Sequence, residues 1–145
     1  MIHNIRYRLF VYEDEDEEEL LQGLKSILPS AKPDRELAEG MLDNKIIILS
    51  GRIDKKKETN EFFENLLNLD YEVLDKLESD LLKKTDKNGN LFLRFSKISA
   101  CNEKWEICDH GDSIHLKVKI AAFPAKKEIA IDLLSDAINS KCGNK

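Results

Sequence analysis

Strict alternation of apolar and polar residues between residues 113 and 120 is the feature that most constrains how this chain can fold. Successive side chains of a β-strand point to opposite faces, so the alternation predicts a strand with one buried and one solvent-exposed face. The exposed face carries His115, Lys117 and Lys119, although the whole chain has a formal net charge of -5. A cationic strip on an acidic chain indicates an anionic partner. The alternative is an ordinary solvated strand face.

Two further segments, residues 2–12 and 91–96, alternate in the same way and extend this interpretation. If the three strands are neighbours, their exposed faces form a cationic surface with interleaved aromatic rings. Such a surface binds phosphates by charge and unpaired bases by stacking. The alternatives are exposed sides of ordinary strands, or a face that docks an acidic protein or a second copy of this chain. The predicted face comprises Arg6, Arg8, Phe10, Phe92, Arg94, His115, Lys117 and Lys119, with Lys97, Lys126 and Lys127 at its rim.

The rest of the chain supplies further strands and several amphipathic helices. The acidic run 13–19 predicts a helix start, with Asp14 or Asp16 as the cap and Pro29 as the stop. The continuous apolar run 46–49, followed by Ile53, predicts a central strand buried on both faces, in which Gly51 marks a bulge or a close backbone approach. The helical patterns over 55–82 predict a helical pair or one bent helix. The remaining expectations are a short strand near 37–42, an Asn88-Gly89 turn, a hairpin of 105–108 with 114–123, and a final helix from Ile129.

This order of elements predicts an α+β fold with a mixed or antiparallel sheet and helices packed on one face. We expect one domain over residues 1–140, followed by a polar tail over 141–145. No apolar run approaches the roughly 20 residues that span a bilayer, and the first residues already read as a strand. The expected compartment is therefore the cytoplasm, without a membrane partner.

Cysteines and histidines give little support for a metal site or an enzyme. We expect reduced thiols at Cys101, Cys108 and Cys142. The alternative is a zinc site that the cysteines form with His110 and His115. The six-residue gap between the first two cysteines does not match the usual spacing of zinc ligands. The chain lacks a glycine-rich phosphate loop, a nucleophile elbow and a zinc-protease helix motif. We therefore expect neither a catalytic activity nor a cofactor.

Several segments resemble a family of small archaeal proteins regarded as RNA-binding, some of them described as exosome-associated. The most specific segments are Asp86–Lys97 and Phe123–Glu128; Ile2-His3, Ile27-Leu28-Pro29 and Gly51-Arg52-Ile53 match at the level of pattern. The resemblance implies an α+β fold similar to that of a ribosomal protein that binds 5S ribosomal RNA, and it implies no enzymatic activity.

By position, the resemblance assigns ligand contacts to two basic pairs. These are Arg94 with Lys97, after the Asn-Gly turn, and Lys126 with Lys127, after the proline. Ser96 and Ile98 stand where the family pattern leads us to expect an acid and an amide. The predicted function is non-catalytic RNA binding, as an accessory in RNA processing or ribosome-related assemblies and with RNA-processing proteins as further partners. The alternative is a protein-interaction or dimerisation subunit.

Overall fold

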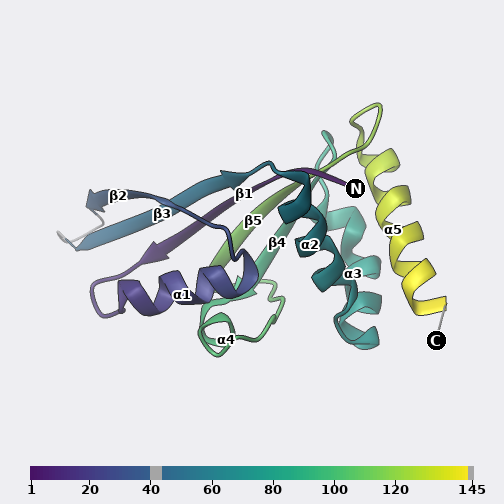
Figure 1. The fold of residues 1–145 in the computed structure, drawn as a ribbon. Coiled ribbons are helices and arrows are strands. Elements are labelled where there is room, and N and C mark those ends of the chain that lie inside the picture. The colour runs from purple at the N-terminus through teal and green to yellow at the C-terminus, as the bar shows by residue number, and fades with distance from the viewer. Residues whose placement is uncertain (40–43, 144–145) are drawn as a thin grey trace. The chain divides into compact units, whose positions relative to one another are not determined.

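The computed structural model describes residues 1–39 and 44–143 (Figure 1). In these two ranges, five strands form an antiparallel sheet in the order β2-β3-β1-β5-β4 and five helices pack against it, which confirms the predicted α+β class. No helix in these two ranges is long and apolar enough to cross a bilayer. The strands are β1 (Ile2–Val11), β2 (Asp34–Glu39), β3 (Lys45–Ile53), β4 (Asn90–Ser96) and β5 (Ser113–Ile120). The helices are α1 (Glu17–Ile27), α2 (Lys56–Leu67), α3 (Tyr71–Lys84), α4 (Lys97–Cys101) and α5 (Lys127–Gly143).

The chain divides into two compact units, which we describe separately. The hairpin unit comprises Arg6–Ile53 and Arg94–Leu116. The three-helix unit comprises Met1–Ile5, Asp54–Leu93 and Lys117–Lys145. A single domain over residues 1–140 stays a prediction.

In the hairpin unit, the acidic run starts α1 as predicted. The Asp16 side chain accepts hydrogen bonds from the backbone N–H groups of Glu18 and Glu19, at 2.9 and 3.3 Å. The following carboxylates lie at the positive end of the helix dipole. Leu20, Leu24 and Ile27 are buried. The acidic run is thus accounted for by helix initiation.

Strands β2 and β3 form an antiparallel hairpin in which Leu37 pairs with Ile47. The expected burial of β3 on both faces is wrong, because Ile46–Ile48 are only half-buried. These residues pair with residues 36–38 of β2 at the edge of the sheet, where solvent reaches both strands. The strand expected near 37–42 begins earlier, at Asp34, and the part of that prediction from residue 40 onwards lies outside the described residues.

The predicted hairpin between residues 105–108 and 114–123 is also wrong. Ile107 instead forms a bridge with Phe95, and the Ser96 N–H donates to the Glu106 carbonyl at 2.9 Å. The Trp105 ring meets Phe95 edge-on with centroids 5.4 Å apart, and its indole N–H donates to the Ser26 carbonyl at 3.2 Å. This packing directs the segment to the end of β4. Residues Lys97–Cys101 form α4.

In the three-helix unit, α3 lies beside α5 and α2 also contacts α5 (Figure 1). The predicted Asn-Gly turn is confirmed, since Gly89 has a φ of 80°. Although burial opposes ionisation of Asp86, hydrogen bonds from Asn90 and Asn88 and the nearby charge of Lys117 lower the pKa of this carboxyl. Strand β5 ends at Ile120, before the expected Phe123, and α5 continues to Gly143 within the expected polar tail.

Candidate nucleic-acid interface

Three of the predicted site residues share one environment in the hairpin unit, although they come from three strands. Arg8 lies on β1, Arg94 on β4 and His115 on β5, the strand between them in the sheet order. Burial lowers the pKa of His115, and the positive charges of Arg94 and Arg8 lower it further. Strands β1 and β4 both neighbour β5 in the sheet, so the two arginines flank the strand that carries His115. We call Arg8, Arg94 and His115 the arginine–histidine cluster.

Aromatic rings adjoin this cluster. The Arg8 guanidinium lies over the ring of Phe10, 5.2 Å from its centroid. The rings of Phe10 and Tyr12 have centroids 6.5 Å apart. Phe10 is half-buried and Tyr12 is exposed. Tyr12 was missed as a site residue, although its two-residue spacing from Phe10 on one strand was a sufficient signal.

The three-helix unit holds a separate group of predicted residues, which we call the lysine cluster: Phe92, Lys117, Lys119, Lys126 and Lys127. The Lys117 ammonium lies 5.9 Å from the ring centroid of the exposed Phe92. The Lys119 ammonium donates to the Asn88 carbonyl. Lys126 is exposed, and the half-buried Lys127 begins α5.

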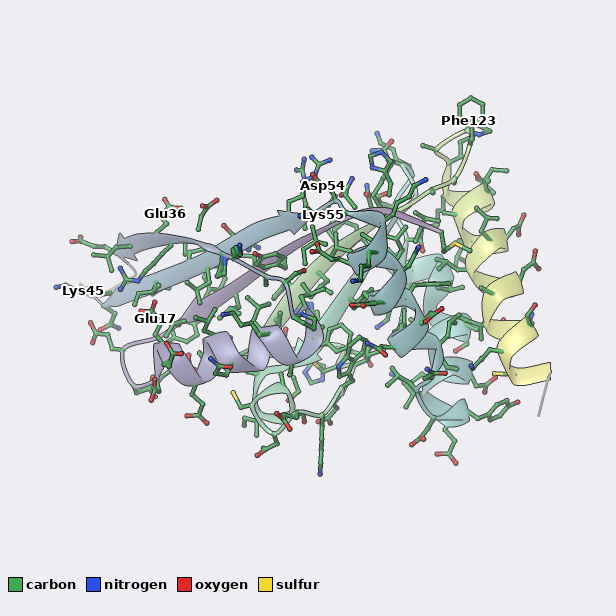
Figure 2. The ribbon with its side chains drawn as sticks, in the orientation of Figure 1. Glu17, Glu36, Lys45, Asp54, Lys55 and Phe123 are labelled. Atoms are coloured by element: carbon green, nitrogen blue, oxygen red, sulfur yellow. The ribbon has the colours of Figure 1, made fainter. Side chains whose placement is uncertain are left out.

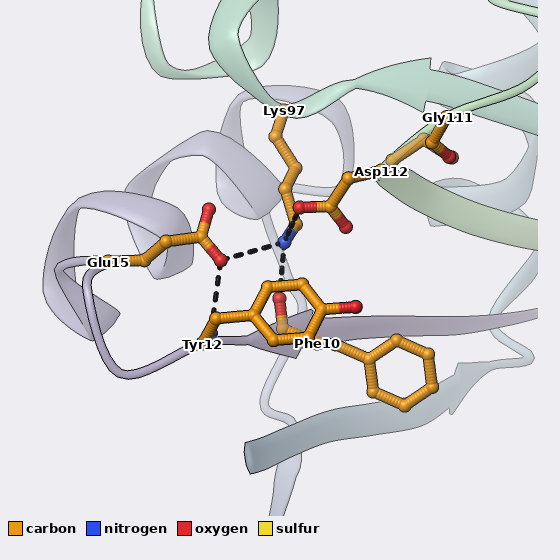
Figure 3. Close-up of polar contacts among 7 residues, drawn as sticks. Phe10, Tyr12, Glu15, Lys97, Gly111 and Asp112 are labelled. Atoms are coloured by element: carbon orange, nitrogen blue, oxygen red, sulfur yellow. Dashed lines mark hydrogen bonds and ion pairs between the residues drawn. The ribbon is translucent and has the colours of Figure 1, made fainter. Parts of the chain in front are cut away.

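Lys97, predicted at the rim, lies instead in the interior of the hairpin unit. Its side chain is only 4% exposed, and its ammonium lies 3.1 Å from Glu15 Oε1 and 2.7 Å from Asp112 Oδ2. The ammonium also donates to the Phe10 carbonyl and lies 4.9 Å from the Tyr12 ring centroid (Figure 3). With its ammonium surrounded in this way, Lys97 is a structural link between loops, and we remove it from the candidate interface. Arg6, by contrast, is exposed on β1.

Other features of the described residues give no positive sign of catalysis. Burial, followed by the charges of Glu19 and Glu15, raises the pKa of Cys101. Burial likewise raises the pKa of Cys108, so both thiols are poor nucleophiles near neutral pH. Residues 1–39 and 44–143 contain no group of three or more histidine, cysteine or acidic side chains arranged to hold a metal.

A shallow hollow of about 310 Å³ lies in the hairpin unit. Carboxylates dominate its polar lining, which makes it unsuited to an anion. It is lined by Asp14, Glu15, Asp16, Glu19, Leu20, Lys97, Ile98, Cys101 and Asn102.

Comparison with known proteins gives the family. A family model described as RNA binding matches residues 4–120. The chain belongs to this RNA-binding family. Within the family, the chain is 30% identical to RNA-binding protein PAB1135 of Pyrococcus abyssi over 140 residues, which cover 89% of this chain and 88% of the relative. The resemblance to a small archaeal RNA-binding family is thereby confirmed.

Solved archaeal structures share the fold of this family member. Mth689, a DUF54 protein from Methanothermobacter thermautotrophicus, is 43% identical with a TM-score of 0.86, over 95% of this chain and 98% of that one. AF2318 from Archaeoglobus fulgidus, also of DUF54, is 25% identical with a TM-score of 0.82, over 94% and 99% of the two chains.

Proposed function

We propose that this protein binds RNA without catalysing a reaction on it, and that the arginine–histidine cluster and the aromatic rings beside it contact the RNA. The observation that carries the proposal is the strand order, which places Arg8 and Arg94 on the two strands that neighbour the strand of His115. The positive charges of both arginines also lower the pKa of His115. Membership of the RNA-binding family supports the choice of RNA as the anion.

The chemistry of the cluster suits an RNA backbone. The two guanidinium groups donate several parallel hydrogen bonds, which match phosphate oxygens. The Phe10 ring under Arg8 adds a flat surface on which a base or a ribose can pack. The acidic net charge makes overall binding modest and strongly salt-dependent, because attraction comes from a local patch.

The lysine cluster adds a second set of cations in the three-helix unit. Lys117 beside Phe92 repeats the combination of a cation and an exposed ring. Lys126 and Lys127 match a basic pair of the family that the sequence resembles. We infer that this cluster also contacts phosphates, and that the protein acts as an accessory in RNA processing or ribosome-related assemblies.

The proposal is tested by titrating a fluorescent single-stranded RNA and a structured hairpin RNA with the full chain at about 50 and about 200 mM salt. We expect binding at the lower salt concentration that weakens steeply at the higher one. The double substitution Arg8→Ala/Arg94→Ala should weaken binding more than tenfold, because it removes two phosphate contacts (~1–3 kcal/mol each). The absence of binding at low salt would refute the proposal.

A matched control variant removes the same number of positive charges at positions outside the arginine–histidine cluster. Arg35 lies in the same unit, and its guanidinium is held by Glu17 at 2.9 Å. Lys104 is exposed beyond α4. Arg35→Ala/Lys104→Ala should retain most of the affinity. If both double variants lose affinity equally, attraction is diffuse and the cluster is not the site.

A further inference from the structure

One aromatic side chain of the three-helix unit has no role in the fold. Phe123 is 98% exposed, so the folded chain gains no burial free energy from this ring. Figure 2 shows the ring at the outer end of the loop between β5 and α5, pointing away from the backbone. Leu82 on α3, the next most exposed large apolar side chain of the unit, is 70% exposed.

The loop that carries Phe123 is hydrogen-bonded to Met1 at its start, and a hydrogen bond between two of its own residues closes a turn at its end. At its start, the Ala121 N–H donates to the Met1 carbonyl at 2.7 Å. At its end, the Lys126 N–H donates to the Pro124 carbonyl at 2.9 Å. The exposed ring is therefore presented on a defined support, which lowers the entropy lost when a ligand packs against it.

The turn at Gly89 packs directly against the end of this loop. A Cβ placed on Gly89 would lie 3.6 Å from the Lys126 carbonyl oxygen and 3.4 Å from the Ala130 Cβ. The Gly89 carbonyl accepts a hydrogen bond from the Ile120 N–H at 3.1 Å. Residues 86–89 and 121–126 thus form one tip of the three-helix unit.

Charges at this tip favour an anionic occupant. Lys126 follows Phe123 by three residues and is exposed, and Lys127 follows by four. Lys87 projects from the adjoining turn and is also exposed. The ionised Asp86 carboxylate accepts hydrogen bonds from Asn88 and Asn90. The local charge stays positive, because Lys87, Lys126 and Lys127 outnumber Asp86 and Glu128. An exposed aromatic ring among lysines is the combination that binds single-stranded nucleic acid, in which every base offers a face for stacking.

We propose that Phe123 stacks on an unpaired base of bound RNA while Lys126 and Lys127 contact the adjacent phosphates. This proposal rests on RNA binding as the function and adds a preference for RNA with unpaired nucleotides. The arginine–histidine cluster supplies charge for any RNA, whereas the Phe123 ring distinguishes an unpaired base from a paired one, because a base inside a duplex offers no free face.

The test compares two RNA probes of equal phosphate number, one single-stranded and one fully paired, in titrations with the full chain. Phe123→Ala should weaken binding of the single strand by about 5- to 100-fold and change binding of the duplex by less than about twofold. Phe123→Trp should retain affinity for the single strand, because it preserves a stacking surface. Phe123→Leu should lose affinity, because it keeps apolar area without a π face. Leu82→Ala is the control, and it should leave both affinities unchanged.

The outcomes separate this proposal from the one on which it rests. If the wild type binds the single strand and Phe123→Ala binds it equally well, stacking is refuted and RNA binding stands. The preference for an unpaired base is refuted if Phe123→Leu binds the single strand with full affinity. It is also refuted if Phe123→Ala weakens binding of the single strand and of the duplex equally. If the wild type binds neither probe at low salt, both proposals are refuted. A dimer that dissociates on Phe123→Ala in sedimentation would assign the ring to a second copy of the chain and refute stacking.

Discussion

The ammonium of Lys97 lies 2.7 Å from Oδ2 of Asp112, although Lys97 begins α4 and Asp112 directly precedes β5. The same ammonium reaches Glu15 Oε1 at 3.1 Å and the Phe10 carbonyl (Figure 3). One buried cation therefore joins the segment after β1, the start of α4 and the segment before β5. The ammonium contacts the Phe10 carbonyl and the Tyr12 ring, so it fixes the end of β1 beside the candidate interface.

Replacing Lys97 with methionine should destabilise the fold and leave RNA contact largely intact. Removal of the buried ammonium leaves two carboxylates and a carbonyl without their partner. Because Asp112 and Glu15 keep part of their hydration, at 43% and 25% side-chain exposure, we expect the free energy of unfolding to fall by about 2 kcal/mol, less than for a fully buried pair. Urea denaturation measures this change, with Lys104→Met as the exposed control. A variant as stable as wild type would contradict the structural role of Lys97.

Single substitutions in the arginine–histidine cluster should change the salt dependence of RNA binding. Each lost phosphate contact should reduce the slope of log K against log salt by about 0.7 for single-stranded RNA. We expect this reduction for Arg8→Ala and for Arg94→Ala, and an unchanged slope for Arg35→Ala. The measurement is the dissociation constant at four salt concentrations. If Arg8→Ala and Arg94→Ala keep the slope of the wild type, the two cluster arginines do not contact phosphate.

Binding of RNA should become tighter as the pH falls through the titration of His115. Burial and the charges of Arg94 and Arg8 lower the pKa of His115 in the free protein below its ordinary value. A phosphate beside the ring favours the protonated form and raises this pKa in the complex. The complex therefore binds more protons than the free protein, and affinity rises as the pH falls from about 8 to about 5.5. The rise is about tenfold for each unit by which the pKa of His115 in the complex exceeds that in the free protein.

The pH dependence is checked with two histidine variants. His115→Gln should flatten the dependence of affinity on pH, whereas His110→Gln, in the exposed segment before β5, should leave it in place. A wild-type affinity that does not change with pH would place His115 outside the RNA contact.

Gly51 is required by the ring of Tyr7 that packs against it. A Cβ at residue 51 would lie 2.3 Å from Tyr7 Oη and 2.6 Å from Tyr7 Cζ. Tyr7 is buried, so the ring cannot move into solvent without losing burial. We expect Gly51→Ala to lower the free energy of unfolding by about 1–3 kcal/mol. The same substitution in a Tyr7→Leu background should cost less, and equal costs in both backgrounds would exclude this clash as the cause.

Local patterns predicted most of the elements. Period-two alternation located β1, β4 and β5, and a cap followed by an apolar stripe located α1, because these signals depend on neighbours within a few residues. The close approach at Gly51 was also expected, although only the structure identifies its partner as Tyr7. The wrong predictions concern segments whose position depends on packing between residues far apart in the chain. Residues 105–108, for example, pair with the end of β4 because Trp105 packs against Phe95.

For the candidate interface too, some features follow from the local sequence and others only from the tertiary structure. The sequence alone determined which side chains leave the core face of each strand, including Arg8, Arg94 and His115, because alternation along a strand is a local property. Only the tertiary structure decided that these three groups share one environment, because strand order depends on contacts between segments far apart in the chain. It also moved Lys97 into the interior, since carboxylates from two distant loops meet around its ammonium. It left the ring of Phe123 in solvent, because none of the described helices and strands of its unit covers this side chain.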